Sequence, residues 1–110
     1  MGAGTIVVVE DRLVSNLVRA VLRRQGYQVT LADTAAEATA LIEAPESSVA
    51  ILITNAPADY LQFSERVRLV YLSSQPDPAL EAAFPSCQVV VKPFIPQELV
   101  QAVDALTETR

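Results

Sequence analysis

Two carboxylates and one ammonium group each follow a short apolar run of the sequence. Glu10 and Asp11 come directly after Thr5-Ile-Val-Val-Val, and Lys92 follows Gln88-Val-Val-Val. A continuous apolar run is typical of a strand buried on both faces, as in a parallel sheet covered by helices. The carboxyl ends of parallel strands share one sheet edge, where open α/β sheets bind their ligands. We therefore expect Glu10, Asp11 and Lys92 to converge on one candidate site.

Strand and helix patterns alternate along the chain. Apolar, β-branched runs predict strands at residues 6–9, 27–31, 49–53, 67–72 and 88–91. Periodic apolar residues predict a helix at about residues 12–25 and a last helix that begins at Pro96. The spacing of Thr34 and Glu37 is that of a capping box, which predicts another helix that ends at Pro45.

Two connections are too short for a long helix. Residues 56–66 leave room only for a short helix or turn, because a parallel crossover needs about ten to twelve residues. Asp77 and Pro78 predict the start of another brief helix, which Pro85 ends. We therefore predict an α/β fold with three layers, built as a doubly wound five-stranded parallel sheet with shortened third and fourth helices.

The first predicted helix carries a broad apolar stripe, which we expect to face the core. The stripe consists of Leu13, Val14, Leu17, Val18, Val21 and Leu22. Its arginines are interpreted as a solvated face. The aromatic residues Tyr60, Phe63 and Phe84 lie in or beside the short segments, where we expect them to fill the core that the trimmed helices leave open.

Length and composition indicate one globular domain, residues 1–110, with 51% hydrophobic and 19% charged residues. The net charge is −5 without a basic stripe, which argues against nucleic-acid binding. The single Cys87 fits a reducing compartment. No signal peptide or membrane-length apolar run is present in the sequence, so we expect a cytoplasmic chain that does not bind a membrane.

These motifs together resemble one family, the CheY-like receiver domains of two-component response regulators, which have the flavodoxin-like fold. The resemblance spans residue 5 to about residue 106. It rests on Val-Val-Glu10-Asp11, Gln25-Gly-Tyr-Gln-Val, Ala36-Glu-Ala, Asn55-Ala-Pro57, Ser73 and Lys92-Pro-Phe, in this order along the chain. No single motif is specific to the family, but the order of the motifs and the total length together strongly indicate its fold.

The resemblance implies roles for matching residues. In that family, two acids after the first strand and a backbone carbonyl after the third bind Mg²⁺, and these positions match Glu10, Asp11 and Asn55. A hydroxyl and a lysine contact the phosphoryl group, and Ser73 and Lys92 match them. The bond between this lysine and the following proline is commonly cis.

The phosphate-accepting aspartate of the family is missing. Its place, counted back from Pro57, falls on Ile53, and a shift of one or two residues gives Thr54 or Asn55. An acyl phosphate requires a carboxylate nucleophile. Thr54 has a hydroxyl, but the chain has no histidine to serve as its base. Asp59 in the following loop is an alternative acceptor if it swings back.

Two further departures point the same way. Val89 occupies the place of the family's switch aromatic, and the third helix is shortened. The missing aspartate also removes one acidic ligand of the metal. Mg²⁺ binding is therefore expected to be weak or lost, because hard cations depend on the number and charge of their oxygen ligands. Without a metal, Glu10 and Asp11 would cap the first helix and pair with Lys92, and Ser73 would serve as a turn hydroxyl.

We interpret the chain as a pseudo-receiver, a non-enzymatic signalling module that works through protein contacts without phosphorylation. The face formed by the fifth strand and its flanking helices is the expected contact surface, with a histidine kinase, an output domain or a second copy as partner. The alternative is a live site that binds Mg²⁺ and takes phosphoryl on a non-standard residue, or that binds a small ligand. A nucleotide-binding enzyme is disfavoured because Glu10-Asp-Arg stands where a glycine-rich loop would be needed.

Overall fold

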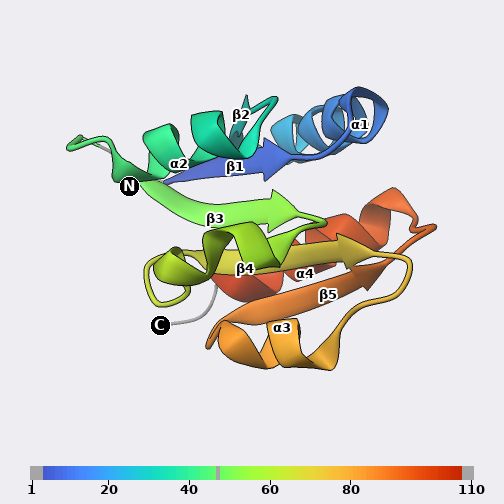
Figure 1. Cartoon of the computed structure of the whole chain (residues 1–110). Coiled ribbons are helices and arrows are strands. Elements are labelled where there is room, and N and C mark those ends of the chain that lie inside the picture. The colour runs from blue at the N-terminus through green and yellow to red at the C-terminus, as the bar shows by residue number, and fades with distance from the viewer. Residues whose placement is uncertain (1–3, 47, 108–110) are drawn as a thin grey trace.

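The computed structural model describes residues 4–46 and 48–107. Five parallel strands form one sheet in the order β2-β1-β3-β4-β5 (Figure 1). The strands are β1 (Thr5–Val9), β2 (Gln28–Leu31), β3 (Val49–Thr54), β4 (Arg68–Ser73) and β5 (Cys87–Val91). This arrangement confirms the predicted doubly wound parallel sheet.

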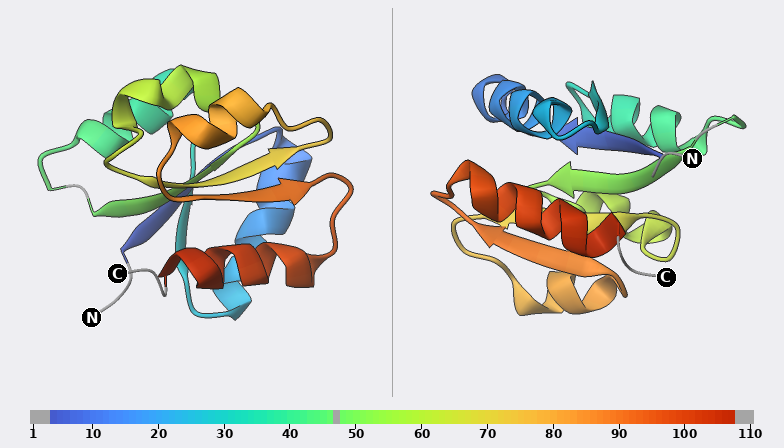
Figure 2. Two further views of the ribbon diagram at one scale, coloured as in Figure 1. Left: turned by 90° about the horizontal axis from the view of Figure 1, so that it is seen from below. Right: turned by 180° about the vertical axis from the view of Figure 1, so that it is seen from behind.

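Helices cover both faces of the sheet and complete the three layers. The helices are α1 (Arg12–Arg24), α2 (Ala35–Glu43), the 3-10 helix η1 (Pro57–Phe63), α3 (Pro78–Ala83) and α4 (Pro96–Thr107). Figure 2 shows α1 and α4 on one face, and α2, η1 and α3 on the other. The third and fourth helical segments have 7 and 6 residues, so the predicted shortening is confirmed.

Two hydrophobic clusters lie on opposite faces of the sheet. One joins side chains of β1, β3, β4 and β5 to α1 and α4, and the other joins alternate side chains of β1, β3 and β4 to α2, η1 and α3. Tyr60, Phe63 and Phe84 are 0%, 4% and 2% exposed and belong to the second cluster. They fill the core beside the short helices, as expected.

The apolar stripe predicted for α1 is only partly correct. Val18 and Leu22 are fully buried, whereas Leu13 is 83% and Leu17 46% exposed. The buried face of α1 is therefore narrower than the predicted stripe, and Leu13 and Leu17 lie outside it. The helix ends before Gly26, whose φ of +93° is a conformation that glycine adopts without strain.

Two strands end one residue later than the sequence pattern predicts. β3 includes Thr54 and β4 includes Ser73, which lie just beyond the predicted ranges 49–53 and 67–72, and β4 begins at Arg68 rather than Val67. Polar side chains at strand ends do not interrupt backbone pairing, so the apolar pattern stops before the strand does. Within the described residues, no helix has the length and apolar character that crossing a membrane requires.

Candidate functional site

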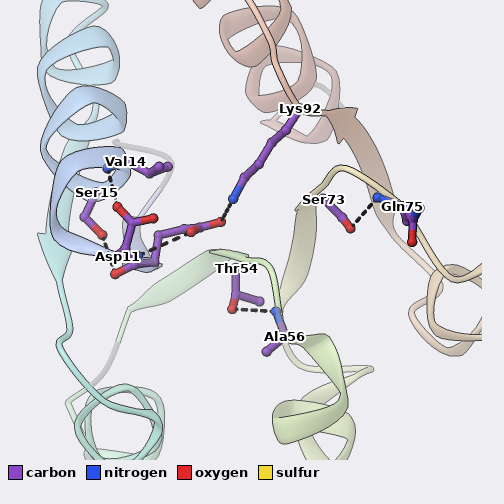
Figure 3. Close-up of polar contacts among 9 residues, drawn as sticks. Asp11, Val14, Ser15, Thr54, Ala56, Ser73, Gln75 and Lys92 are labelled. Atoms are coloured by element: carbon purple, nitrogen blue, oxygen red, sulfur yellow. Dashed lines mark hydrogen bonds and ion pairs between the residues drawn. The ribbon is translucent and has the colours of Figure 1, made fainter.

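An ion pair joins the ends of β1 and β5 at the carboxyl edge of the sheet. Lys92 Nζ lies 2.9 Å from Glu10 Oε2, and the side chains are 25% and 1% exposed, respectively. Lys92 reaches from the end of β5 towards the start of α1 (Figure 3). Apart from Lys92, no polar group among the described residues contacts Glu10 Oε2. The lysine therefore supplies the charge that balances a buried carboxylate.

Asp11 is the N-cap of α1. Its Oδ1 accepts a hydrogen bond from the Val14 N–H at 3.0 Å, and its own N–H donates to Glu10 Oε1 at 3.3 Å. The Ser15 hydroxyl donates to the Glu10 carbonyl at 3.1 Å. One carboxylate thus neutralises the lysine and the other stabilises the first turn of a helix, where negative charge is favoured.

The residues matched to the acceptor position differ in their surroundings. Ile53 is fully buried within the hydrophobic cluster beneath α1 and α4. Thr54 ends β3 beside Val9 and is 1% exposed, and its hydroxyl accepts a hydrogen bond from the Ala56 N–H at 3.1 Å. Of the two, Thr54 is the residue that lies at the sheet edge.

Ser73 and Lys92 are neighbours through their backbones. The Lys92 N–H donates to the Ser73 carbonyl at 2.9 Å, while the Ser73 hydroxyl accepts from the Gln75 N–H at 3.0 Å. Figure 3 shows the Ser73 side chain turned towards Gln75. The Lys92-Pro93 peptide bond is cis, as the resemblance implies. The serine therefore serves as a turn hydroxyl in this structure.

A cavity of about 230 Å³ opens at the same edge. Its lining includes Glu10, Asp11, Thr54, Asn55 and Asp59. Five strands end here, and the loops after β1, β2 and β3 form the walls. The structure therefore collects most of the residues that sequence reasoning singled out, whereas Ile53, Ser73 and Lys92 do not line this cavity.

The residues present do not make a strong magnesium site. Among the described residues, no group of three or more acidic, histidine or cysteine side chains is placed to hold a metal ion. Glu10 is already paired with Lys92, and Asp11 is engaged as a helix cap. Because Mg²⁺ relies on several oxygen ligands with little competition, this edge offers it a poor set.

Sequence reasoning did not assign Asp33 and Tyr60 to this cavity, which both residues line. The Tyr60 hydroxyl is buried and has no hydrogen-bond partner among the described residues. Burial, with a smaller contribution from Asp59, raises the pKa of Tyr60 above its ordinary value. Asp33 follows β2, so the rule that strand ends share an edge could have identified it. Tyr60 lies inside an irregular helix whose orientation the sequence pattern does not predict.

Comparison with solved structures identifies the fold as that of receiver domains. A response regulator from Thermotoga maritima is 18% identical, with a TM-score of 0.80, over 96% of this chain and 98% of that chain. A putative response regulator from Chloroflexus aurantiacus J-10-fl is 24% identical, with a TM-score of 0.78 and the same coverage of both chains. NtrX from Brucella abortus is 18% identical, with a TM-score of 0.79, over 98% of this chain but 26% of that chain.

No protein-family model matches the sequence, and no match was found among curated proteins. The likeness therefore lies in the three-dimensional arrangement, which is that of CheY-like receivers.

Proposed function

We propose that this chain is a receiver-like module of two-component signalling that acts through protein contacts without being phosphorylated on aspartate. Two observations at the sheet edge support the proposal. Thr54 occupies the end of β3 at the candidate site, and Lys92 is already neutralised by the buried Glu10. The carboxylate that the family's chemistry requires is therefore replaced by a hydroxyl, and the matching lysine already has an acidic partner.

The chemistry of Thr54 supports this proposal. Its hydroxyl would need a base to become a nucleophile, and the chain contains no histidine. The hydroxyl instead accepts the Ala56 N–H bond, which holds the loop after β3. Thr54 therefore has a structural role, which is to hold the loop after β3.

The proposed partners are proteins, either a histidine kinase or an output domain, and the proposed compartment is the cytoplasm. One solved structure with this fold is described as a probable two-component system response regulator/GGDEF domain protein. The match covers 94% of this chain and 49% of that chain. That pattern supports an output domain as partner. On this proposal the chain is not an enzyme.

Intact mass spectrometry tests the proposal. The protein is incubated with Mg²⁺ and a small acyl-phosphate donor, and we expect no phosphoryl adduct on the wild type. Thr54→Asp restores a carboxylate at the end of β3, and this variant is expected to gain an adduct. A wild-type adduct that disappears in a Glu10→Ala/Asp11→Ala double variant would show a live site and contradict the proposal.

A second candidate function is a still-regulated site, favoured by the cavity beside Glu10, Asp11 and Thr54. It would bind Mg²⁺ weakly and take phosphoryl on Thr54 or Asp59, or it would hold a small ligand. Titration with Mg²⁺ followed by amide NMR separates the two candidates. Shifts confined to Glu10, Asp11 and Ser73 would favour the live site, and Thr54→Ala and Asp59→Ala would then identify the acceptor.

A further inference from the structure

A cavity of about 670 Å³ opens at the amino edge of the sheet, opposite the candidate site. It lies where β3, β4 and β5 begin, and Figure 1 shows the starts of these strands at the edge away from their arrowheads. Ser48 comes directly before β3, Arg66 belongs to the loop between η1 and β4, and Ser86 comes directly before β5. Three segments that are far apart in the sequence therefore form the walls of a cavity with the size of a small-molecule site.

Most polar side chains that line this cavity can donate hydrogen bonds. They belong to three serines, two arginines and one glutamate, which are Ser48, Ser64, Ser86, Arg66, Arg68 and Glu65. The arginines bring two positive charges and the glutamate one negative charge, whereas the whole chain has a net charge of −5. A local excess of positive charge on an acidic chain favours an anion at this place.

Arg66 is held in position by the end of α2. Its Nη2 donates to the Ile42 carbonyl at 2.8 Å, which is one of the last carbonyls of that helix and attracts a cation. A guanidinium has five N–H donors, so this bond leaves others for an oxyanion. Within the residues that the structure describes, no ion pair joins Arg66 to Glu65. Because the bond to Ile42 already orders the arginine, binding through it loses less conformational entropy.

Hydrogen bonds also fix the backbone of the cavity walls. The Leu69 N–H donates to the Ser86 carbonyl at 2.9 Å, which ties the segment before β5 to β4. In the loop before β4, the N–H groups of Arg66 and Val67 both donate to the Phe63 carbonyl, at 2.8 and 3.0 Å. The side chains of Arg66 and Ser86 therefore extend from a fixed backbone, as in a small-molecule site that is formed before its ligand arrives.

We propose that this cavity binds a phosphate group, either free or carried by a small organic molecule. Guanidinium groups bind phosphate oxygens through charge-assisted hydrogen bonds, and serine hydroxyls can donate to the remaining oxygens. A tetrahedral phosphate presents oxygens in several directions, which suits donors on three walls better than a planar carboxylate does. The cavity is larger than one phosphate ion, and Val49 and Pro85 supply apolar lining for an organic part.

Isothermal titration calorimetry and amide NMR test the site. Sodium phosphate, phenyl phosphate and sodium acetate are added separately at constant ionic strength. We expect both phosphates to shift the amide signals of Ser64, Arg66 and Ser86, and acetate to bind at least about tenfold more weakly. Tighter binding of phenyl phosphate identifies a phosphorylated small molecule as the ligand, and tighter binding of inorganic phosphate identifies free phosphate. Either result supports the site.

Three variants test the residues that carry the site. Arg66→Gln should weaken the binding of phenyl phosphate at least about tenfold, because it removes a charge-assisted hydrogen bond. Arg23→Gln is the matched control: it removes the same charge from the last turn of α1, outside the cavity, and should bind like the wild type. Ser86→Ala keeps the backbone bond to Leu69 and should weaken binding about threefold, so it tests the site without the bond to Ile42 being lost. Circular dichroism checks that each variant is folded.

Three results would overturn the proposal. They are an absence of amide shifts at the amino edge with either phosphate, acetate that binds as tightly as phosphate, and an equal loss of binding in Arg66→Gln and Arg23→Gln.

The cavity and the candidate site lie at opposite edges of the sheet, so their tests are independent. Binding here is read from amide shifts of residues such as Ser64 and Ser86, whereas the proposed function is read from a phosphoryl adduct by mass. Failure of the phosphate site and failure of the proposed function are therefore distinguishable.

Discussion

At the residue scale, the Glu10–Lys92 pair places a buried carboxylate and a lysine together at the sheet edge. A carboxylate that is 1% exposed loses most of its hydration, and the lysine at 2.9 Å compensates for this loss. An incoming anion would have to draw Lys92 away from Glu10 and leave that carboxylate buried without a partner. The pair therefore ties anion binding at this edge to an energetic cost.

Removing Lys92 alone should lower the free energy of unfolding more than removing both members of the ion pair. Lys92→Met leaves Glu10 buried and unpaired, and we expect it to lower the free energy of unfolding by about 2 kcal/mol. This loss is smaller than for a fully buried ion pair, because Lys92 is partly exposed. Glu10→Gln/Lys92→Met removes both charges and should cost less than the sum of the single changes. Urea unfolding monitored by circular dichroism measures all three variants. Strict additivity would show that the ion pair contributes little.

Cys87 is expected to react slowly with alkylating agents. Burial, with a smaller contribution from Glu81, raises the pKa of the Cys87 thiol to about 11 from an ordinary value of 9.0. The thiolate is the reactive form, so at pH 8 its fraction should be about a hundredfold smaller than for an ordinary cysteine. The alkylation rate should rise with pH up to about 11. Mass spectrometry of iodoacetamide-treated protein, with a cysteine peptide as reference, measures this dependence.

At the element scale, the sequence pattern predicts which segments are strands and helices, because buried runs and amphipathic periods are local signals. It predicts less well where a strand ends: Thr54 and Ser73 are polar, yet they remain in the ladder. It also overestimates how much of α1 is buried, since the width of the covered face depends on the neighbouring elements. Leu13 and Leu17 show this limit.

Two leucines of α1 should differ sharply in their contribution to stability. Leu22 is fully buried, so Leu22→Ala is expected to lower the free energy of unfolding by about 2–5 kcal/mol. Leu13 is 83% exposed, so Leu13→Ala should change it by less than about 0.5 kcal/mol. Thermal and urea unfolding of both variants measure the difference. Equal losses would mean that Leu13 is covered by another surface in solution.

At the scale of the whole molecule, the site depends on contacts between distant segments. Glu10 and Lys92 are separated by most of the chain, and parallel pairing of five strands brings them together. The rule that parallel strands end at one edge predicted this meeting from the sequence. Which oxygen each side chain engages could not be predicted, because it follows from cap geometry and from the buried position of Glu10.

The sheet also separates the core into two clusters that should respond independently to mutation. Ile51 packs on the α1 and α4 side beside Ile6, its partner in the strand register, and Ile42 packs on the opposite side. Ile→Val at any of these positions should cost about 0.5–1.5 kcal/mol.

The two double variants then distinguish shared from separate packing. The effects of Ile42→Val and Ile51→Val should add within about 0.5 kcal/mol, since the two side chains share no neighbours across the sheet. Ile6→Val/Ile51→Val should depart from additivity, because one rearranged cavity can serve both truncations. Urea unfolding of the wild type, the two single variants and the double variant in each cycle tests this. Strong coupling across the sheet would mean that strand positions shift to repair the core, so that both faces relax as one unit.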